Sequence, residues 1–469
     1  MNYEICMHLV NNFKEKYKFI LINLLFCFLP AAIIIGNSIV NINIVLFIIF
    51  SLIFFYKDLL TFKFNNIDKL VLSIFIFSLF TSAYNILQNY ISPFELNFDT
   101  IPEVLHSHYI TFLNKYDFNY LILKAIGYSR FFIFYFLVRM LLDKNIINLK
   151  FIYYSASFLC IFVMFDVVFQ FINGKDIFGL NSPHPRKFSG PFGSELVAGG
   201  YILNFSFFAL SLPFSTQLFK NKKSIYLFPL FILIISSLIM AGNRMSIILF
   251  LFTLGFFSIF KQKYFNYFLI ILITVFSLIF FLKKNNPLVN HNINHFQASV
   301  VSMFNISKNV LTNNFEDSDR QKNDFPEQLR EFETFYDTWQ LNKYIGGGIR
   351  SYRFNCTMRG NISLNERITC NTHPHNYYLE IITDLGIFGL LAFSFLFFKV
   401  FIESLKITFL LKSRKNFLLF PFIMILFVEI FPLKSSGSFF FTTNSLIVFM
   451  CIAVLVSFIK KDNIEKLEK

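Results

Sequence analysis

Long apolar blocks dominate the pattern of hydrophobic and polar positions along this chain. In residues 42–56, 70–80 and 225–241 the apolar side chains follow one another without a helical or strand period. A helix that is apolar on every side needs lipid or a very large protein core around it, and lipid is the simpler explanation. Because roughly 20 helical residues cross a bilayer, the blocks predict about twelve membrane-spanning helices. The predicted spans lie near residues 19–36, 42–56, 70–90, 119–142, 150–172, 197–215, 225–241, 245–260, 265–282, 376–402, 417–433 and 438–459.

Basic residues occur in every second loop between these blocks, and this alternation predicts the orientation of the chain. The basic segments lie around 57–69, 144–150, 220–223, 261–263 and 399–416 and in the tail from 460 onward. By contrast, residues 36–41 contain no Lys or Arg, and residues 91–118 contain only Lys115. Loops rich in Lys and Arg stay in the cytoplasm. We therefore expect both termini in the cytoplasm and a multi-pass membrane chain. The loops expected in the periplasm are 91–118, 173–196 and 283–375.

The predicted fold class is therefore all-α, a polytopic integral membrane protein. Residues 1–282 are expected to form nine transmembrane helices with short loops, residues 283–375 one large periplasmic loop, and residues 376–469 the last three helices and a cytoplasmic tail. The composition agrees, since 15% of residues are charged and soluble chains carry roughly a quarter. The net charge of +14 is explained by topology and lipid anchoring, which excludes a nucleic-acid partner and makes the bilayer the expected one.

One segment of the large loop has the period of an amphipathic helix. Asp324 and Pro326 suit an N-cap and a first turn, and four aromatic residues follow at i, i+3, i+4 and i+7. These residues are Phe332, Phe335, Tyr336 and Trp339. Such a helix either packs on its own domain or lies at the bilayer surface, and the sequence leaves both alternatives open.

The cysteines support the predicted sides of the membrane. Only Cys356 and Cys370 fall in the large outer loop, whereas the other four lie in predicted spans or in the cytoplasm. An isolated pair in an oxidising compartment predicts a disulfide, with two free thiols as the alternative. A bridge closing so short a loop would stabilise it by about 3 kcal/mol.

The segment around His375 carries the predicted chemistry. Pro374 suits a first helical turn, which places His375 and Asn376 at the outer end of the tenth span. Unpaired N–H groups and the partial positive charge of a helix N-terminus attract phosphate and keep a nearby imidazole neutral, as a general base must be. Gly386 and Gly389 would allow close helix packing one turn further in. A histidine in this position can also be a simple polar cap, so the case depends on its neighbours.

Those neighbours are basic and are predicted to lie on the same side of the membrane. Arg244 occupies a tight hairpin, while Arg186 and Lys187 belong to the loop 173–196. Arg350 and Arg353 follow a Gly-Gly-Gly turn. The guanidinium fork binds phosphate oxygens bidentately, which suits a diphosphate. For any single one of these residues the alternative is an anchor at the membrane interface. Five of them near a histidine favour a phosphate site.

The sequence resembles the O-antigen ligases and the related O-antigen polymerases. His375-Asn376 followed after nine residues by Gly386-Ile387-Phe388-Gly389 is similar to the His-Asn and Gly-x-x-Gly signature of that family. The hairpin Gly242-Asn243-Arg244-Met245-Ser246 resembles its arginine turn. A third similar stretch runs from Asp166 and Gln170 through Gly174, Arg186 and Gly190-Pro191-Phe192 to Glu195. The resemblance extends over residues 120–405 and includes the position of the long loop. The N-terminal third and the loop with His106 and His108 match no pattern of the family.

The resemblance implies a GT-C-like membrane glycosyltransferase of lipopolysaccharide biosynthesis with no cofactor. An undecaprenyl-diphosphate-linked glycan would place its diphosphate among Arg186 and Arg244, which stabilise the leaving group in place of a metal. His375 would deprotonate a hydroxyl of lipid A–core or another glycan acceptor, which attacks the anomeric carbon with inversion. Further expected contacts to substrate come from Asn376, Arg350, Arg353, Lys187, Glu195, Glu380 and Arg130. Arg130, inside the fourth span, would hold the lipid phosphate or pair with Asp166.

Three other functions compete with a ligase. A polymerase extends the same lipid-linked glycan and differs only in its acceptor, which the sequence does not reveal. A polysaccharide transporter or flippase would show internal repeats and charged, broken helices at mid-membrane, and no clear repeat is visible. A metal-dependent glycosyltransferase would need a ligand set. Its candidate ligands are Asp317, Asp319 and the pairs His106/His108 and His373/His375, which do not form a convincing set.

Overall fold

The computed structural model describes residues 16–91, 119–215, 223–260, 262–312, 327–356, 373–410, 418–434 and 437–467. Within these ranges the chain is helical and forms no β-strand; it contains two isolated β-bridges, Lys175 with Asn181 and His184 with Lys187. The predicted all-α class is therefore confirmed for the part of the chain that is described.

The helices follow the apolar blocks of the sequence. In the first half they are Lys16–Cys27, α2 (Leu29–Ile35), α3 (Asn37–Leu60), α4 (Asn66–Ile91), α6 (Asn119–Asp143), α7 (Leu149–Asn173), the short η2 (Gly190–Phe192), α8 (Ala198–Ser215) and α9 (Lys223–Met240). In the second half they are α10 (Arg244–Ser258), α11 (Gln262–Asn285), α12 (Pro287–Leu311), α14 (Glu327–Gln340), α15 (Tyr352–Asn355), α16 (Tyr377–Leu405), η5 (Lys406–Leu410), α17 (Phe420–Glu429) and α18 (Thr442–Leu467).

Fewer helices in the described part of the chain qualify as membrane spans than the sequence predicts. Among the described residues, 7 helices are long and apolar enough to cross a membrane, or 8 if Lys16–Cys27 and α2, bent by 44°, form one span. Tyr226–Met240, Arg244–Ser258 and Phe420–Glu429 are apolar but have only 10–17 residues. At about 1.5 Å per residue, such helices do not reach across a hydrocarbon core of roughly 30 Å. The predicted count of about twelve is therefore not confirmed, although each apolar block forms a helix.

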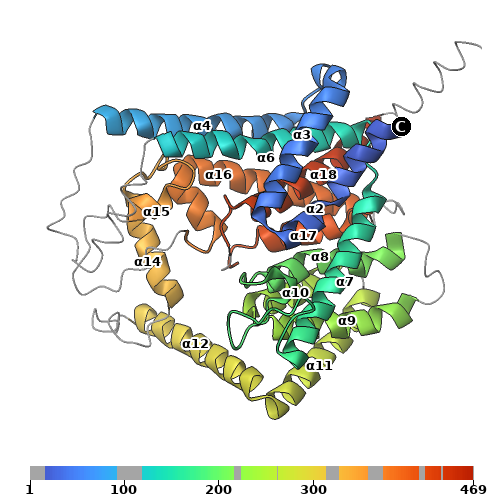
Figure 1. Cartoon of the computed structure of the whole chain (residues 1–469). Helices are drawn as coiled ribbons and strands as arrows, with labels where there is room; N and C mark the ends of the chain where they lie inside the picture. Colours follow the sequence, from blue (N-terminus) through green and yellow to red (C-terminus); the bar gives the residue numbers. More distant parts are fainter. Residues whose placement is uncertain are drawn as a thin grey trace, which may run out of the picture.

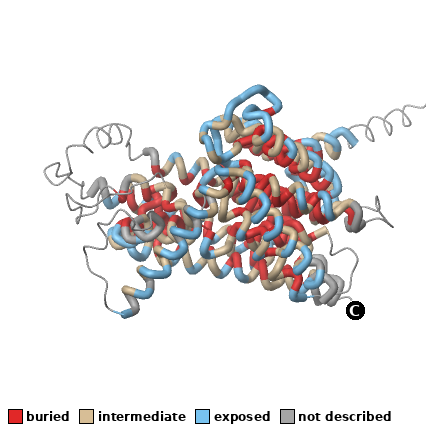
Figure 2. The backbone as a smooth tube through the Cα atoms, turned by 90° about the horizontal axis from the view of Figure 1, so that it is seen from below, coloured by how far each residue is buried: buried red, intermediate tan, exposed pale blue. Residues whose placement is uncertain are grey.

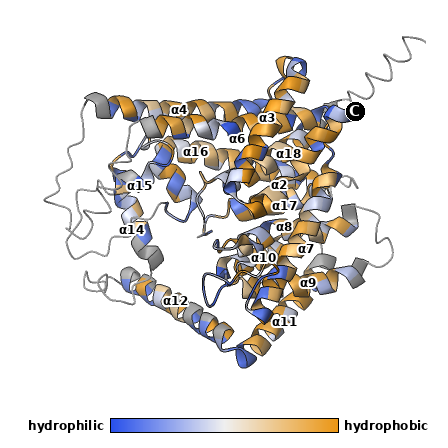
Figure 3. Ribbon diagram, in the orientation of Figure 1, coloured by the Kyte–Doolittle hydropathy of each residue, from blue (hydrophilic) through white to orange (hydrophobic). Residues whose placement is uncertain are grey.

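Helix α18 packs closely against α6 and is the most deeply buried of the candidate spans. In α18 the apolar window of Thr442–Lys460 is 83% buried, whereas only 6% of the corresponding window of α11 is buried. Figure 2 shows buried residues concentrated in the middle of the bundle, and Figure 3 shows hydrophobic residues along α4, α9 and α16 with a more hydrophilic α14. In Figure 1, α14 and α15 lie at the opposite end of the bundle from the C-terminus.

A buried charge network joins three helices near the C-terminal end of the bundle. Arg139 and Asp68 are fully buried with 3.8 Å between Nε and Oδ1, and Arg139 also contacts Asp143. Tyr135 donates a hydrogen bond to Asp68 (2.8 Å), and Lys460 pairs with Asp143 at 2.9 Å. The negative charges of Asp68 and Asp143 thus compensate the positive charges of Arg139 and Lys460, which lowers the cost of placing charges inside a membrane protein. The network holds α4, α6 and α18 together, and the sequence analysis did not predict it.

Helix α16 is broken at Gly386, where φ is +67°. The backbone of the preceding loop enters this break. The N–H of Gly347 donates to the carbonyl of Thr383 (3.0 Å), and that of Ile387 donates to the carbonyl of Lys343 (3.0 Å). The predicted role of Gly386 in helix–helix packing is therefore wrong, because the contact it allows is with a loop. A Cβ at Gly389 would meet Leu385 of its own helix at 2.2 Å.

We expect Gly386→Ala to destabilise the protein strongly. An alanine at φ +67° is strained, and its Cβ would lie 2.1 Å from the carbonyl oxygen of Tyr344. Strain and overlap together should cost about 3 kcal/mol or more. The midpoint of thermal unfolding in nanodiscs measures the effect. Gly200→Ala is the matched control, because a Cβ at Gly200 meets nothing within 4 Å. Equal midpoints for the two variants would show that the break does not depend on glycine.

Candidate functional site

The N-terminus of α16 presents His375 just outside the helix. The helix begins at Tyr377 and is capped by Asn376, whose side chain accepts hydrogen bonds from the N–H groups of Tyr378 and Leu379. His375 therefore lies one residue before the cap, not in the first turn as the sequence predicted, and its backbone has φ +23°. A non-glycine residue in this conformation is strained, and such strain is common at functional sites.

The imidazole of His375 is accessible and lies beside two other titratable groups. Its side chain is 41% exposed, and its Nε2 lies 3.9 Å from Oε1 of Glu331 on α14. Its ring centroid lies 4.5 Å from that of His373, in an edge-on arrangement. The site therefore presents an accessible imidazole with a carboxylate near one of its nitrogens. The sequence analysis did not single out Glu331.

His373 reveals the positive character of this region. Its pKa is lowered from 6.5 to about 4, first by burial and then by the charges of His375, Arg353 and Arg350. His373 is consequently neutral at physiological pH, and the two arginines predicted to bind substrate act on it directly. The structure thus brings His375, Arg350 and Arg353 into one group of residues, hereafter the α16 group.

The low pKa of His373 predicts a pH dependence of stability. Between pH 4 and 6.5 the unfolded chain binds a proton at this residue and the folded chain does not, so stability falls as pH is lowered through this window and is fully present above it. We expect His373→Gln to flatten this dependence. Unfolding midpoints in nanodiscs at pH 4.5 and 7 provide the measurement, with exposed His291→Gln on α12 as the control. A wild type whose midpoint changes no more than that of His373→Gln would contradict the assignment.

Arg350 is held in place by two acidic residues of α16. Its N–H donates to Oδ2 of Asp384 (2.6 Å), and its guanidinium Nη2 donates to the carbonyl of Phe440 (2.8 Å). The segment containing Phe440 is in turn bound by Glu380, whose Oε1 accepts a hydrogen bond from Ser438 (2.6 Å). Both carboxylates are buried. Glu380 and Asp384 thus position Arg350, and a direct contact of Glu380 with substrate stays a prediction.

Arg130 joins this group from α6. Its Nη2 lies 3.4 Å from Oγ1 of Thr442 at the start of α18, and it interacts electrostatically with Arg350. The alternative predicted partner, Asp166, instead accepts a hydrogen bond from the N–H of Ile177 (2.8 Å). The structure therefore places Arg130 with the α16 group rather than with Asp166.

A second basic group forms where the loop 173–196 meets the hairpin between α9 and α10. The N–H of Phe188 donates to the carbonyl of Met240 (3.2 Å). A Cβ on Gly242 would lie 2.8 Å from Cγ of Lys187, so glycine permits this close approach. Arg244, at the start of α10, is partly buried and interacts electrostatically with Arg186. Arg186, Lys187 and Arg244 therefore constitute what we call the hairpin group, and Glu195 is exposed in the same loop.

The end of α17 and the segment after it connect the two groups. The amide of Asn376 donates to the carbonyls of Pro432 (2.7 Å) and Lys434 (3.2 Å), so the cap of α16 is tied to this segment. Buried Lys434 pairs with buried Glu429 at 2.6 Å, and Glu429 accepts a hydrogen bond from Asn204 of α8 (2.8 Å). These contacts give Asn376 a structural role, and its use in substrate binding stays a prediction.

Helix α8, which contacts Glu429 through Asn204, also contacts the hairpin between α9 and α10. Its Gly199 packs so closely against the hairpin that an added Cβ would lie 2.6 Å from Cβ of Asn243. The α16 group and the hairpin group therefore share one scaffold. Their convergence on a single pocket remains a prediction. Glu429 could have been found from sequence, because a lone acid inside an apolar block is costly and marks a buried partner or a site.

The predicted amphipathic helix of the large loop is present as α14. Phe335 is buried against Tyr352 and Cys356, with Leu379 of α16 packed beside them, whereas Phe332 remains 52% exposed. Cys356 is disulfide-bonded. Several predicted residues lie outside the described ranges: Asp324, Pro326, Cys370, His106, His108, Asp317 and Asp319. The pairing of Cys356 with Cys370 and contact of α14 with the bilayer therefore stay predictions.

Fold and site together define a multi-pass helical membrane protein with basic residues and a histidine gathered at helix ends. Residues 229–394 match the family model described as O-antigen ligase, which supports assignment to the O-antigen ligase/polymerase family. The match includes His375, Arg244, Arg350 and Arg353 but not Arg186, and it is narrower than the 120–405 resemblance seen in the sequence. The family indicates a glycosyltransferase-like bacterial membrane enzyme acting on lipid-linked glycans. Comparison with curated proteins gives no significant match.

Proposed function

We propose that this protein is an O-antigen ligase-type glycosyltransferase of the bacterial inner membrane. It transfers a glycan from undecaprenyl diphosphate to a sugar hydroxyl of lipid A–core at the periplasmic face. The observation that carries the proposal is the accessible His375, 3.9 Å from Glu331 and beside His373, on which the charges of Arg350 and Arg353 act. The match to the O-antigen ligase family supports the same class of reaction.

In the proposed mechanism His375 is the general base. It removes the proton from the acceptor hydroxyl as the oxygen attacks the anomeric carbon, while the bond from that carbon to the diphosphate oxygen breaks. The attack comes from the side opposite the leaving group, so the configuration inverts. Oε1 of Glu331 faces Nε2 of this imidazole at 3.9 Å. The proton thus ends on His375, and the negative charge ends on the leaving diphosphate.

The arginines complete the mechanism by accepting the diphosphate. Arg186, Arg244 and Lys187 of the hairpin group would bind its oxygens, with Arg130, Arg350 and Arg353 extending the positive surface toward the glycan. Guanidinium groups stabilise the charge that develops on the leaving group and hold it by paired hydrogen bonds. A metal ion is not required in this scheme, because the basic side chains supply the positive charge.

The proposed sidedness follows from the charges and from the position of the site. The basic loops predict a cytoplasmic C-terminus, and α14 and α15 lie at the other end of the bundle (Figure 1). In this proposal the chain has about twelve apolar helices, some of them too short to cross the membrane alone, and a large loop on the periplasmic side. The alternative function is a polymerase that extends the lipid-linked glycan, since both reactions use the same chemistry. The family match gives less support to a transporter or flippase.

A direct test supplies the purified protein in nanodiscs with lipid-linked glycan and one acceptor at a time. Product on lipid A–core supports the ligase, whereas longer lipid-linked glycans support the polymerase. Activity that survives EDTA agrees with the metal-independent scheme. Absence of product with both acceptors, from a preparation that is folded by thermal unfolding, would overturn the proposal.

A further inference from the structure

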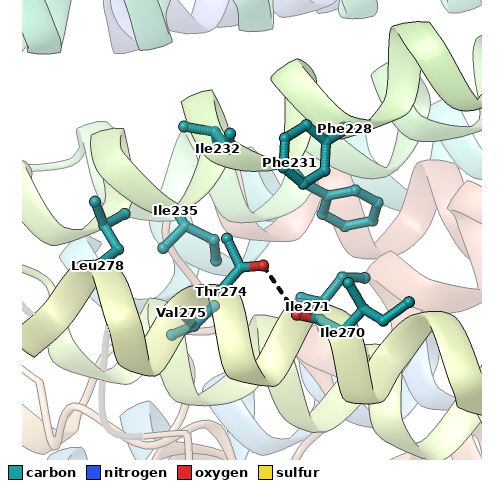
Figure 4. A pocket seen from close by; sticks show the side chains of 9 residues that line it. All are labelled: Phe228, Phe231, Ile232, Ile235, Ile270, Ile271, Thr274, Val275 and Leu278. Carbon is teal, nitrogen blue, oxygen red and sulfur yellow. Dashed lines mark hydrogen bonds between the residues drawn. The ribbon is translucent and has the colours of Figure 1, made fainter.

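An apolar groove lies between α9 and α11 (Figure 4). Its volume is about 40 Å³, well below that of sites that enclose a whole ligand, so it can hold only part of a long molecule. Thr274 is the one polar residue in its lining, and its hydroxyl donates to the carbonyl of Ile270 (2.9 Å), so the wall offers no free donor. The lining residues are Phe228, Phe231, Ile232 and Ile235 of α9 and Ile270, Ile271, Thr274, Val275 and Leu278 of α11. Such a groove suits a hydrocarbon chain and not a sugar or a phosphate.

The groove lies about halfway along both helices. Ile232 is close to the middle of α9 (Lys223–Met240), and Thr274 is at the middle of α11 (Gln262–Asn285). Phe228 and Ile270 are 57% and 54% exposed, so the groove is open to the surroundings of the helices. At this depth those surroundings are the hydrocarbon core of the bilayer. A lipid tail can therefore enter sideways from the membrane.

Helix α9 leads from the groove to the hairpin group. Ile235 is the last lining residue of α9, and the helix ends at Met240, whose carbonyl is bound by Phe188. At about 1.5 Å per residue, five residues span roughly 8 Å. Arg244 and Arg186 follow directly beyond this end. A lipid with its tail in the groove would thus place an anionic head group among guanidiniums, which match it in charge.

We propose that the groove between α9 and α11 holds the head-proximal part of the hydrocarbon tail of the lipid-linked glycan donor. This inference rests on the proposed function. We infer that the occupant is the donor lipid, because an apolar groove that leads to a basic cluster fits a hydrocarbon chain with a phosphate or diphosphate head group. Since surrounding lipid is almost as apolar as the groove, the groove adds only a small amount of binding free energy, and it also orients the donor. It aligns the diphosphate with the reacting groups.

The test fills the groove and compares two donors. Thr274→Phe places a ring in the groove, and Ile273→Phe is the matched control, because Ile273 is 67% exposed and does not line it. One donor carries the long polyprenyl chain, and the other carries the same glycan diphosphate on a two-isoprene chain that is too short to occupy the groove. We expect Thr274→Phe to raise KM for the long donor about fivefold, an effect of about 1 kcal/mol by the usual conversion. KM for the short donor and both values for Ile273→Phe should stay unchanged.

Photo-crosslinking identifies the occupant independently of activity. A polyprenyl diphosphate with a diazirine near its head should label α9 or α11 in the wild type and in Ile273→Phe, but not in Thr274→Phe. Labelling by a photoreactive phospholipid alone, or crosslinks between two copies of the chain, would overturn the inference, as would equal KM values for all variants. If the wild type transfers glycan from neither donor, the proposed function fails. If it transfers from both but polyprenyl labelling maps elsewhere, only the groove assignment fails.

Discussion

His375→Ala is expected to lower the turnover of glycan transfer by roughly 10²–10⁴-fold, the usual contribution of a general base. The variant lacks the group that accepts the proton of the attacking hydroxyl. Binding of the donor should change little, because the arginines that hold the diphosphate remain. The measurement is kcat with purified protein in nanodiscs, with lipid-linked glycan and acceptor both saturating.

The design separates loss of chemistry from loss of structure. The fold does not depend on the imidazole of His375, because Asn376 caps α16 and binds Pro432 and Lys434. Membrane insertion and the unfolding midpoint should therefore match the wild type. His291→Ala, an exposed histidine of α12, is the matched control. Normal turnover of His375→Ala with an intact fold would remove His375 from its proposed role.

Arg244→Ala is expected to reduce kcat/KM by roughly 10²–10³-fold, as loss of one preorganised donor to a developing charge does elsewhere. Without this guanidinium the leaving diphosphate loses charge stabilisation, and the hairpin group keeps only Arg186 and Lys187. Transfer rates over a range of donor concentrations give kcat and KM separately. A fall in kcat together with kcat/KM would show that Arg244 acts mainly in the transition state.

Arg244→Lys is the informative second variant. It keeps the charge but loses the planar fork, so part of the activity should return. Lys284→Ala, an exposed base in the last turn of α11, provides the control for a simple loss of positive charge. If Arg244→Ala retains normal kcat/KM, or if Lys284→Ala loses as much, a specific role of Arg244 in binding the diphosphate is excluded.

The site was partly predictable because its residue types are unusual in a membrane protein. An arginine and a histidine at the ends of apolar blocks stand out, which made Arg244 and His375 visible in the sequence, and the Gly-Gly-Gly turn drew attention to Arg350. Glu331, Glu380 and Asp384 were harder to interpret. The partner of an acidic side chain in a loop helix or inside a span cannot be inferred from neighbouring residues. Only the tertiary structure showed that Glu331 on α14 lies beside His375, that Glu380 binds the segment from Ser438 to Phe440, and that Asp384 binds Arg350.

By itself the sequence determined where the helices lie, because long apolar runs in this chain can be covered only by lipid or by each other. It also determined which residue types stand at their ends. Only the tertiary structure decided that Gly386 breaks α16 to receive a loop, that Arg130 joins Arg350 rather than Asp166, and that the hairpin group and the α16 group share one scaffold. These contacts join segments far apart along the chain. They depend on how whole helices pack, which no local pattern of residues specifies.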